Sequence, residues 1–93
     1  MWYTYILQCA DDSFYIGHTD NISERVSAHN SGRAAKWTAC RLPVNLVYVE
    51  NWQTLEESIR RELQIKKRSK AKKEALIFGN LKKLKSLARC HSR

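Results

Sequence analysis

Residues 2–19 have the sequence WYTYILQCADDSFYIGHT. Aromatic and β-branched residues run without a break over residues 2–9, which predicts a β-strand. Residues 10–13 are a turn signal, because Asp and Ser side chains bond to nearby backbone groups in turns. Residues 14–19 resume the strand pattern. The chain therefore begins with a predicted β-hairpin, and the other elements are expected to assemble around it.

A helix is predicted directly after this hairpin. Asp20 is its expected N-cap, and the helix is expected over residues 21–31. Ile22 and Val26 are four positions apart, so they share the face that points inward. Gly32 stands where a helix commonly ends in the left-handed conformation.

A third strand is expected further along the chain. Residues 34–37 have the pattern of a short helical turn, and Pro43 then interrupts the chain. Residues 44–49 alternate apolar and other side chains, as in a half-buried strand. The side chains expected to face the core are Val44, Leu46 and Tyr48.

The remaining residues are predicted to be helical. Thr54 and Glu57 have the spacing of a capping box, in which each side chain bonds to the backbone at the other residue. The helix that they open is expected to reach Lys67, and one of its faces carries Ile59, Leu63 and Lys66. Ser69 is the expected cap of a second helix, which runs to residues 76–78 and ends at residues 79–80. A last helix is expected over residues 81–93, with leucines at helical spacing and lysines between them.

These elements predict an α+β fold with a small antiparallel three-stranded sheet flanked by helices. A chain of 93 residues is too short for two independent cores. We therefore expect one domain over residues 1–80 and a basic C-terminal helix over residues 81–93.

Composition excludes several classes of protein. No run of 18 apolar residues is present, so no membrane span is expected, and the N-terminus lacks the pattern of a secretory signal. Cys9, Cys40 and Cys90 form no CxxC pair, which favours reduced thiols and a cytoplasmic location.

Positive charge is concentrated in the second half of the chain. Residues 1–50 carry four Lys or Arg and five Asp or Glu, whereas residues 51–93 carry thirteen and four. Such asymmetry favours a polyanionic partner, which for a small basic domain means nucleic acid. A solvated helix surface is the alternative reading of the same charges.

Residues with catalytic potential occur on the predicted hairpin and helices. Tyr5 and Tyr15 fall on adjacent strands, and Gly17 would let a backbone or ligand approach closely. Arg25 and His29 share one helix face at i, i+4. Glu62 lies among basic residues and could be a metal ligand or part of an ordinary ion pair. Taken singly, each residue also has an ordinary structural explanation: half-buried strand tyrosines, a surface arginine, a core histidine.

The order and spacing of these residues resemble the GIY-YIG nuclease superfamily. A Tyr-x-Tyr segment ends at Tyr5, nine residues follow, and Tyr-Ile-Gly occupies residues 15–17. Arg25 and His29 come next, and Glu62 follows on a later helix. Residues 3–9, 29–32, 46–48 and 60–67 are similar to the small stand-alone bacterial members, the UPF0213 group, which resemble the C subunit of the excision-repair nuclease. The first motif departs from the family pattern, since Gly and Ile are replaced and only Tyr5 remains.

The resemblance implies an endonuclease that hydrolyses phosphodiester bonds with one Mg²⁺ or Mn²⁺ ion. It implies that Tyr5 and Tyr15 flank the attacking water, with Tyr15 preferred as general base. It also implies that Arg25 binds phosphate oxygens and that Glu62 is the single protein ligand of the metal. His29 would support a tyrosine or contact phosphate. We expect the sheet to place Tyr5, Tyr15, Arg25 and Glu62 around one cleft.

Nucleic-acid contacts are expected from positions near the motifs and from the basic stretch, namely Lys36, Thr38, Lys66, Lys67, Lys70 and Lys73. DNA is favoured over RNA as the substrate, in repair or processing, and target selection is expected to come from the basic helices or from a protein partner. A module of the same fold that binds DNA or RNA without cutting it is the main alternative, and a structural role in an RNA or repair assembly is another. The presence of all the catalytic residue types favours the nuclease.

Overall fold

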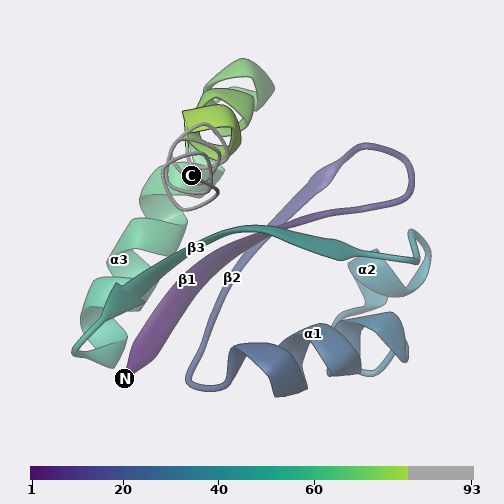
Figure 1. The fold of residues 1–93 in the computed structure, drawn as a ribbon, viewed down its shortest axis with the longest axis horizontal. Coiled ribbons are helices and arrows are strands. Elements are labelled where there is room, and N and C mark those ends of the chain that lie inside the picture. Colours follow the sequence, from purple (N-terminus) through teal and green to yellow (C-terminus); the bar gives the residue numbers. More distant parts are fainter. Residues whose placement is uncertain (80–93) are drawn as a thin grey trace, which may run out of the picture.

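The computed structural model describes residues 1–79, in which a three-stranded antiparallel sheet separates helices on its two faces (Figure 1). The strands are β1 (Trp2–Gln8), β2 (Phe14–Thr19) and β3 (Asn45–Trp52). Their order in the sheet is β2-β1-β3, so β1 is central. The predicted α+β class and the three-stranded sheet are confirmed.

The hairpin of β1 and β2 places Tyr5 opposite Gly17 in the strand register. Its turn includes Asp12 in the left-handed region, with φ of 67°, and Asp11 accepts a hydrogen bond from the backbone N–H of Ser13 at 3.1 Å. Asp and Asn adopt this backbone conformation more readily than other residues with side chains. The predicted turn chemistry thus fixes the register that aligns the two tyrosine segments.

Strand β3 departs from the predicted alternation. Its pairing with β1 shifts between Ile6 and Leu7, which pair with Tyr48 and Leu46, so Val47 is an additional residue in β3. A bulge of this kind resets which side chains face the core. Leu46 is consequently exposed, and Val47 and Tyr48 both pack against the core. The expectation for Leu46 was wrong, while Val44 is buried as predicted.

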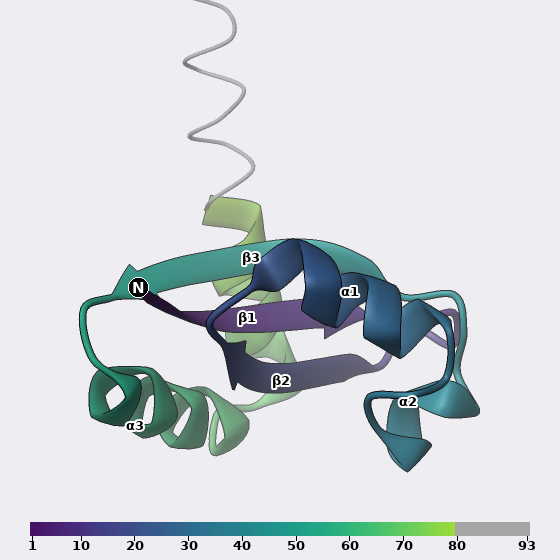
Figure 2. The ribbon, with the colours of Figure 1, turned by 90° about the horizontal axis from the view of Figure 1, so that it is seen from below.

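Helix α1 (Ile22–Asn30) lies on one face of the sheet with the short α2 (Lys36–Ala39) (Figure 2). The N-cap of α1 is Asn21 rather than Asp20, since the Asn21 side chain accepts from the backbone N–H of Glu24 at 3.1 Å. Gly32 has φ of 77°, as predicted for the residue that ends the helix. The short helix α2 begins two residues later than expected.

Helix α3 (Leu55–Lys66) covers the opposite face, and its capping box is present as predicted. Its buried residues are Ser58 and Ile65, whereas Leu63 is 52% exposed. The expected inward face of this helix was therefore wrong. The helix is placed by Ser58, whose backbone carbonyl accepts from the Thr4 hydroxyl at 2.8 Å.

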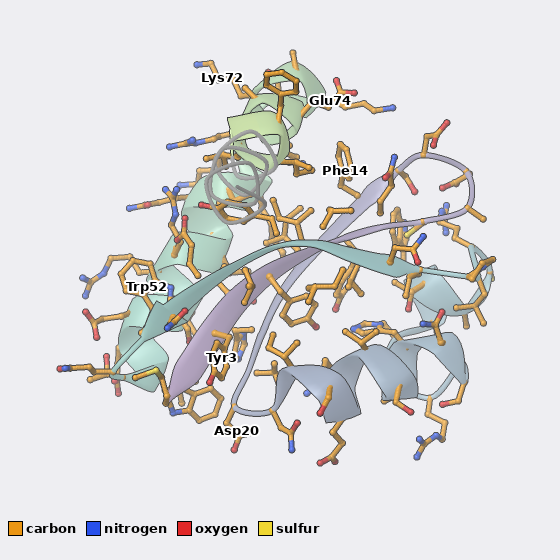
Figure 3. All side chains as sticks on the ribbon, viewed as in Figure 1. Tyr3, Phe14, Asp20, Trp52, Lys72 and Glu74 are labelled. Atoms are coloured by element: carbon orange, nitrogen blue, oxygen red, sulfur yellow. The ribbon has the colours of Figure 1, made fainter. Side chains whose placement is uncertain are left out.

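Residues 70–79 form a further helical segment. Ser69 accepts from the backbone N–H of Lys72 at 3.3 Å, in agreement with its predicted capping role. Phe14 points toward this segment, and Trp52 lies against α3 (Figure 3). The predicted helix over residues 81–93 lies outside the described residues.

Two apolar clusters, one on each side of the sheet, hold these layers together. On the α1 side, Tyr5, Leu7, Cys9 and Val44 are buried. On the α3 side, the buried residues are Ile6, Ile16, Ile65 and Ile77. Each fully buried aliphatic side chain contributes about 1.5–3 kcal/mol relative to an exposed one. Among residues 1–79, no helix has the length and apolar character needed to cross a membrane.

Candidate active site

Tyr5 and Tyr15 lie on the α1 face of the sheet, beside His29 of α1. The Tyr5 hydroxyl is 3.0 Å from His29 Nε2. The ring of Tyr15 meets the His29 ring edge to face, with centroids 4.9 Å apart, and its centroid is 6.4 Å from that of Tyr5. The two strand tyrosines and the helix histidine therefore form one cluster.

The hydrogen bonds of this cluster assign the protons. The Thr38 hydroxyl donates to the carbonyl of Ala35 at 3.1 Å, so its oxygen must accept from His29 Nδ1, 2.9 Å away. A neutral imidazole that carries its proton on Nδ1 has a lone pair on Nε2. The Tyr5 hydroxyl is then the donor to His29, and its oxygen lone pairs stay available.

The pKa values of this cluster agree with neutral groups. Burial raises the pKa of the Tyr5 phenol above its ordinary value; charge on Tyr15 and Glu62 raises it further, and Arg25 lowers it. Burial and the positive charge of Arg25 both lower the pKa of His29. Tyr5 is therefore held as a phenol that donates to a neutral imidazole, and Arg25 of α1 acts on both groups.

The Tyr5 ring of this cluster packs against the backbone at Gly17. A Cβ at this position would lie 2.5 Å from the Tyr5 hydroxyl oxygen, 2.7 Å from its Cζ and 3.2 Å from a ring carbon of Tyr15. The first two of these distances are much shorter than a van der Waals contact between heavy atoms. The close approach that the sequence suggested at Gly17 is thus made by the ring of Tyr5.

Glu62 approaches the sheet from its other face. Its carboxylate lies 2.6 Å from His18 Nδ1 and 2.6 Å from Lys66 Nζ, and its side chain is 12% exposed. Successive residues of a strand point to opposite faces, so His18 turns toward α3 while Gly17 and Tyr15 face α1. Tyr5, Tyr15 and His29 therefore lie on the α1 face and Glu62 on the α3 face, rather than together on one face as a single cleft would require. Glu62 is still close enough for its charge to act on Tyr5.

Arg25 borders a surface cavity of about 210 Å³ at the start of α1. Its other lining residues include Thr19, Asp20 and Glu24. A guanidinium at the mouth of an open cavity can reach a phosphate group, and its planar fork suits phosphate oxygens. Arg25 is thus half-buried at this cavity, and its charge acts on both Tyr5 and His29.

The other predicted contacts differ in their exposure. Thr38 is fully buried and its hydroxyl serves His29, so its expected contact with nucleic acid was wrong. Lys36, Lys67 and Lys70 are exposed. Lys73 is half-buried, and Lys66 forms an ion pair with Glu62.

His18 and the role of Thr38 were not predicted from the sequence. The strand alternation contained a signal for His18, since it pairs with Thr4 on the face that α3 covers. No local pattern connects Thr38 with His29, because the two residues belong to different helices. Their contact depends on how α2 packs against α1.

A divalent ion would have one carboxylate available here. Within residues 1–79, no three His, Cys, Asp or Glu side chains are grouped as a metal site. Glu62 supplies hard oxygen donors, which suit Mg²⁺ or Mn²⁺, and such ions commonly keep several waters. Lys66 is 49% exposed and can move from the carboxylate toward solvent. The donor set therefore fits a single ion with one protein ligand.

Comparison with known proteins identifies the family of this chain. A family model of the GIY-YIG catalytic domain matches residues 1–75. A UPF0213 protein of Streptococcus pneumoniae is 40% identical over 78 residues, covering 84% of this chain and 79% of its own. A UPF0213 protein of Natronomonas pharaonis is 44% identical over 75 residues, covering 81% and 88%.

Two solution NMR structures resemble this fold. That of a UPF0213 protein from Bacillus halodurans has 41% identity, 83% coverage of both chains and a TM-score of 0.53. That of a protein from E. faecalis has 38% identity, 85% coverage of both chains and a TM-score of 0.55. The chain belongs to the GIY-YIG catalytic domain family and is similar to its UPF0213 proteins.

Proposed function

We propose that this protein is a metal-dependent endonuclease that hydrolyses phosphodiester bonds in nucleic acid. Membership in the GIY-YIG catalytic domain family supports this reaction class. The observation that supports catalysis by this chain is the hydrogen-bond chain from Tyr5 through His29 to Thr38, with Arg25 close enough to act on its groups.

Tyr15 is the proposed general base, and Tyr5 positions the water. Tyr5 has its proton directed to His29 Nε2 and a raised pKa, which makes it a poor base and a good hydrogen-bonding partner. In the reaction, the Tyr15 phenolate takes a proton from water as the water oxygen bonds to phosphorus. The bond from phosphorus to the leaving oxygen breaks, and that oxygen takes a proton from solvent.

Arg25 is proposed to bind the non-bridging oxygens of the phosphate. Negative charge grows on these oxygens as the pentacovalent phosphorane forms, so a fixed cation stabilises the transition state more than the ground state. The same positive charge acts on the Tyr5 phenol, whose pKa it lowers against the larger effect of burial.

Glu62 is proposed to hold the divalent ion. A bound Mg²⁺ or Mn²⁺ would supply Lewis-acid stabilisation of the phosphate oxygens. His18 donates to one carboxylate oxygen at 2.6 Å, which fixes the direction of the other. An incoming cation would have to displace the Lys66 ammonium group from the Glu62 carboxylate.

The proposed substrate is DNA in preference to RNA, bound by exposed lysines next to the site. Lys67 and Lys70 follow Glu62 along the chain, and Lys36 lies at the start of α2. These charges suit backbone contacts that do not distinguish one sequence from another. We propose a role in repair or processing, with target choice left to nucleic-acid structure or to a protein partner.

The test is loss of cleavage at retained binding in Glu62→Gln and Arg25→Ala. Gln keeps the size of Glu and an oxygen acceptor for His18, but lacks the charge that holds a cation. Arg25→Ala removes transition-state stabilisation, and removal of one such donor lowers rates about 10²–10³-fold in other enzymes. Nicking of plasmid and of labelled oligonucleotides is measured with Mg²⁺, Mn²⁺ or EDTA.

Matched variants separate the site from general charge effects. Glu56→Gln and Arg60→Ala make the same changes at exposed positions of α3 and should leave nicking unchanged. Circular dichroism and melting curves verify folding, with a cost of about 1 kcal/mol expected for the paired Glu62. Full activity in Glu62→Gln would contradict the metal-ligand role. A wild-type protein that binds but never cuts would favour the non-catalytic module.

A further inference from the structure

The short helix α2 presents one side chain to the active-site cluster and the next one to solvent. Thr38 is fully buried against His29, to which its hydroxyl is hydrogen-bonded. Trp37, its neighbour in sequence, is 40% exposed. Because one turn of helix carries both residues, the position of Trp37 is tied to the position of the catalytic cluster.

Arg41 holds the exposed indole in place. Its guanidinium carbon lies 4.1 Å from the centre of the Trp37 ring, which is a cation–π contact. Its Nη1 donates to the Trp37 carbonyl at 2.8 Å, and its Nε donates to Asp11 at 3.1 Å. Asp11 belongs to the turn of the β1–β2 hairpin, so Arg41 connects the indole to the sheet.

The other neighbour of Trp37 is the proposed general base. The Trp37 and Tyr15 ring centroids are 6.1 Å apart, with the rings inclined by 31°. Tyr15 in turn contacts His29. A row of aromatic rings therefore leads from solvent to the cluster, and Trp37 is its outermost member.

We propose that Trp37 stacks on an unpaired base next to the phosphate that is cut, so that the preferred substrate is single-stranded or locally unpaired nucleic acid. This inference rests on the proposed nuclease function. The guanidinium of Arg41 and the ring of Tyr15 both border the indole, and the 40% of Trp37 that stays exposed is the surface that a base would cover. A base inside a duplex already stacks on its two neighbours, so only an unpaired base gains from the contact. Exposed Lys36 precedes Trp37 and is placed to meet the adjoining phosphate.

Binding without cleavage tests this proposal separately from catalysis. Fluorescence anisotropy in EDTA gives Kd values for a labelled single strand and for the matching duplex. Stacking on an aromatic side chain corresponds to about a 5- to 150-fold change in Kd per base. Trp37→Ala should weaken single-strand binding within that range and change duplex binding less than twofold. Trp37→Phe should restore most of the affinity. Phe78→Ala, at an aromatic residue that is 67% exposed on helix 70–79, is the matched control and should change neither value.

An abasic substitution identifies the base that stacks. Moving one abasic nucleotide along the single strand should weaken wild-type binding at one position and have no further effect in Trp37→Ala. Equal losses on single strand and duplex, or an abasic effect that persists in Trp37→Ala, would overturn the stacking role while the nuclease proposal stands. The stacking role is likewise overturned if Trp37→Ala binds and cuts like wild type, and the exposed indole would then be assigned to contact with another protein. A wild type that binds no nucleic acid would overturn both proposals.

Discussion

Tyr5 shows how much of the site depends on a single side chain and the space beside it. Its ring lies over Gly17, and its hydroxyl donates to His29. The missing Cβ of Gly17 is therefore a condition for the hydrogen bond. A glycine in a strand normally weakens the sheet, and here it admits the ring of a residue on the neighbouring strand.

Gly17→Ala should destabilise the protein and displace Tyr5. The added methyl would lie 2.5 Å from the Tyr5 oxygen, and overpacking of this kind costs about 1–3 kcal/mol. Urea denaturation followed by circular dichroism measures the loss of unfolding free energy, and nicking should fall with it because the donor to His29 has moved. Gly79→Ala is the control, since nothing lies within 4 Å of its Cβ position. A Gly17→Ala protein as stable and active as wild type would contradict the packing described for Tyr5.

The sequence supplied a set of candidate residues but not their geometry. Tyr5, Tyr15 and Arg25 were expected from the resemblance to GIY-YIG nucleases, and they fall on the hairpin and on the helix that follows it. The role of Thr38 could not be found in this way, because its contact with His29 joins two helices whose packing no short pattern encodes. His18 was overlooked because its partner, Glu62, lies 44 positions away.

At the scale of elements, helix α3 has the clearest local determinants and the least predictable orientation. Its capping box is present as expected from Thr54 and Glu57. Its buried face is centred on Ser58 and Ile65, although Leu63 is more apolar than Ser58. The Thr4 hydroxyl explains this orientation of the helix. It donates to the backbone carbonyl of Ser58, so α3 must lie close to β1 at Ser58. A small residue permits that approach where a leucine would prevent it.

Thr54→Ala should lower stability without changing the rate of cleavage. The Thr54 side chain accepts from the backbone N–H of Glu57 at 3.2 Å, and loss of such a cap costs about 1 kcal/mol. For a domain of this size the melting temperature should fall by about 4–8 °C. Glu62 lies two turns further on and is held by His18 and Lys66, so nicking at about 25 °C should match wild type.

Thr54→Ser keeps the cap and serves as the control for this prediction. Its melting temperature should stay close to that of the wild type. If Thr54→Ala loses activity well below its melting temperature, the start of α3 has a role in the site beyond holding the helix together.

For the whole molecule, the distribution of charge is the property that sequence predicts most directly. Thirteen of the seventeen Lys and Arg residues follow residue 50. The structure places those of residues 66–73 directly after the helix turn that carries Glu62. The charge of a side chain does not depend on how the chain packs, so this expectation could be made from the sequence alone. Lys66 differs from the others because it also pairs with the Glu62 carboxylate.

Replacing Lys67, Lys70 and Lys73 with Ala should reduce the salt dependence of binding. Removal of one phosphate-binding side chain lowers the slope of log affinity against log salt by about 0.7 for a single strand and about 0.9 for a duplex. Single and triple variants should therefore give graded slopes, measured by anisotropy at several salt concentrations. Lys66 is left unchanged so that Glu62 keeps its partner. Slopes that do not respond to these changes would assign the lysines to a solvated surface.

The position of β2 constrains how copies of this protein can associate. Within residues 1–79, β2 pairs only with β1, so one of its edges has no strand beside it. On this strand, His18 contacts Glu62 from one face and Tyr15 contacts His29 from the other, so the proposed substrate would have to pass along this edge to meet both. A second copy that extended the sheet by pairing with β2 would occupy the same space. Substrate and such a dimer would then compete, and an assembly that retains cleavage would have to form through another surface, such as the outer edge of β3.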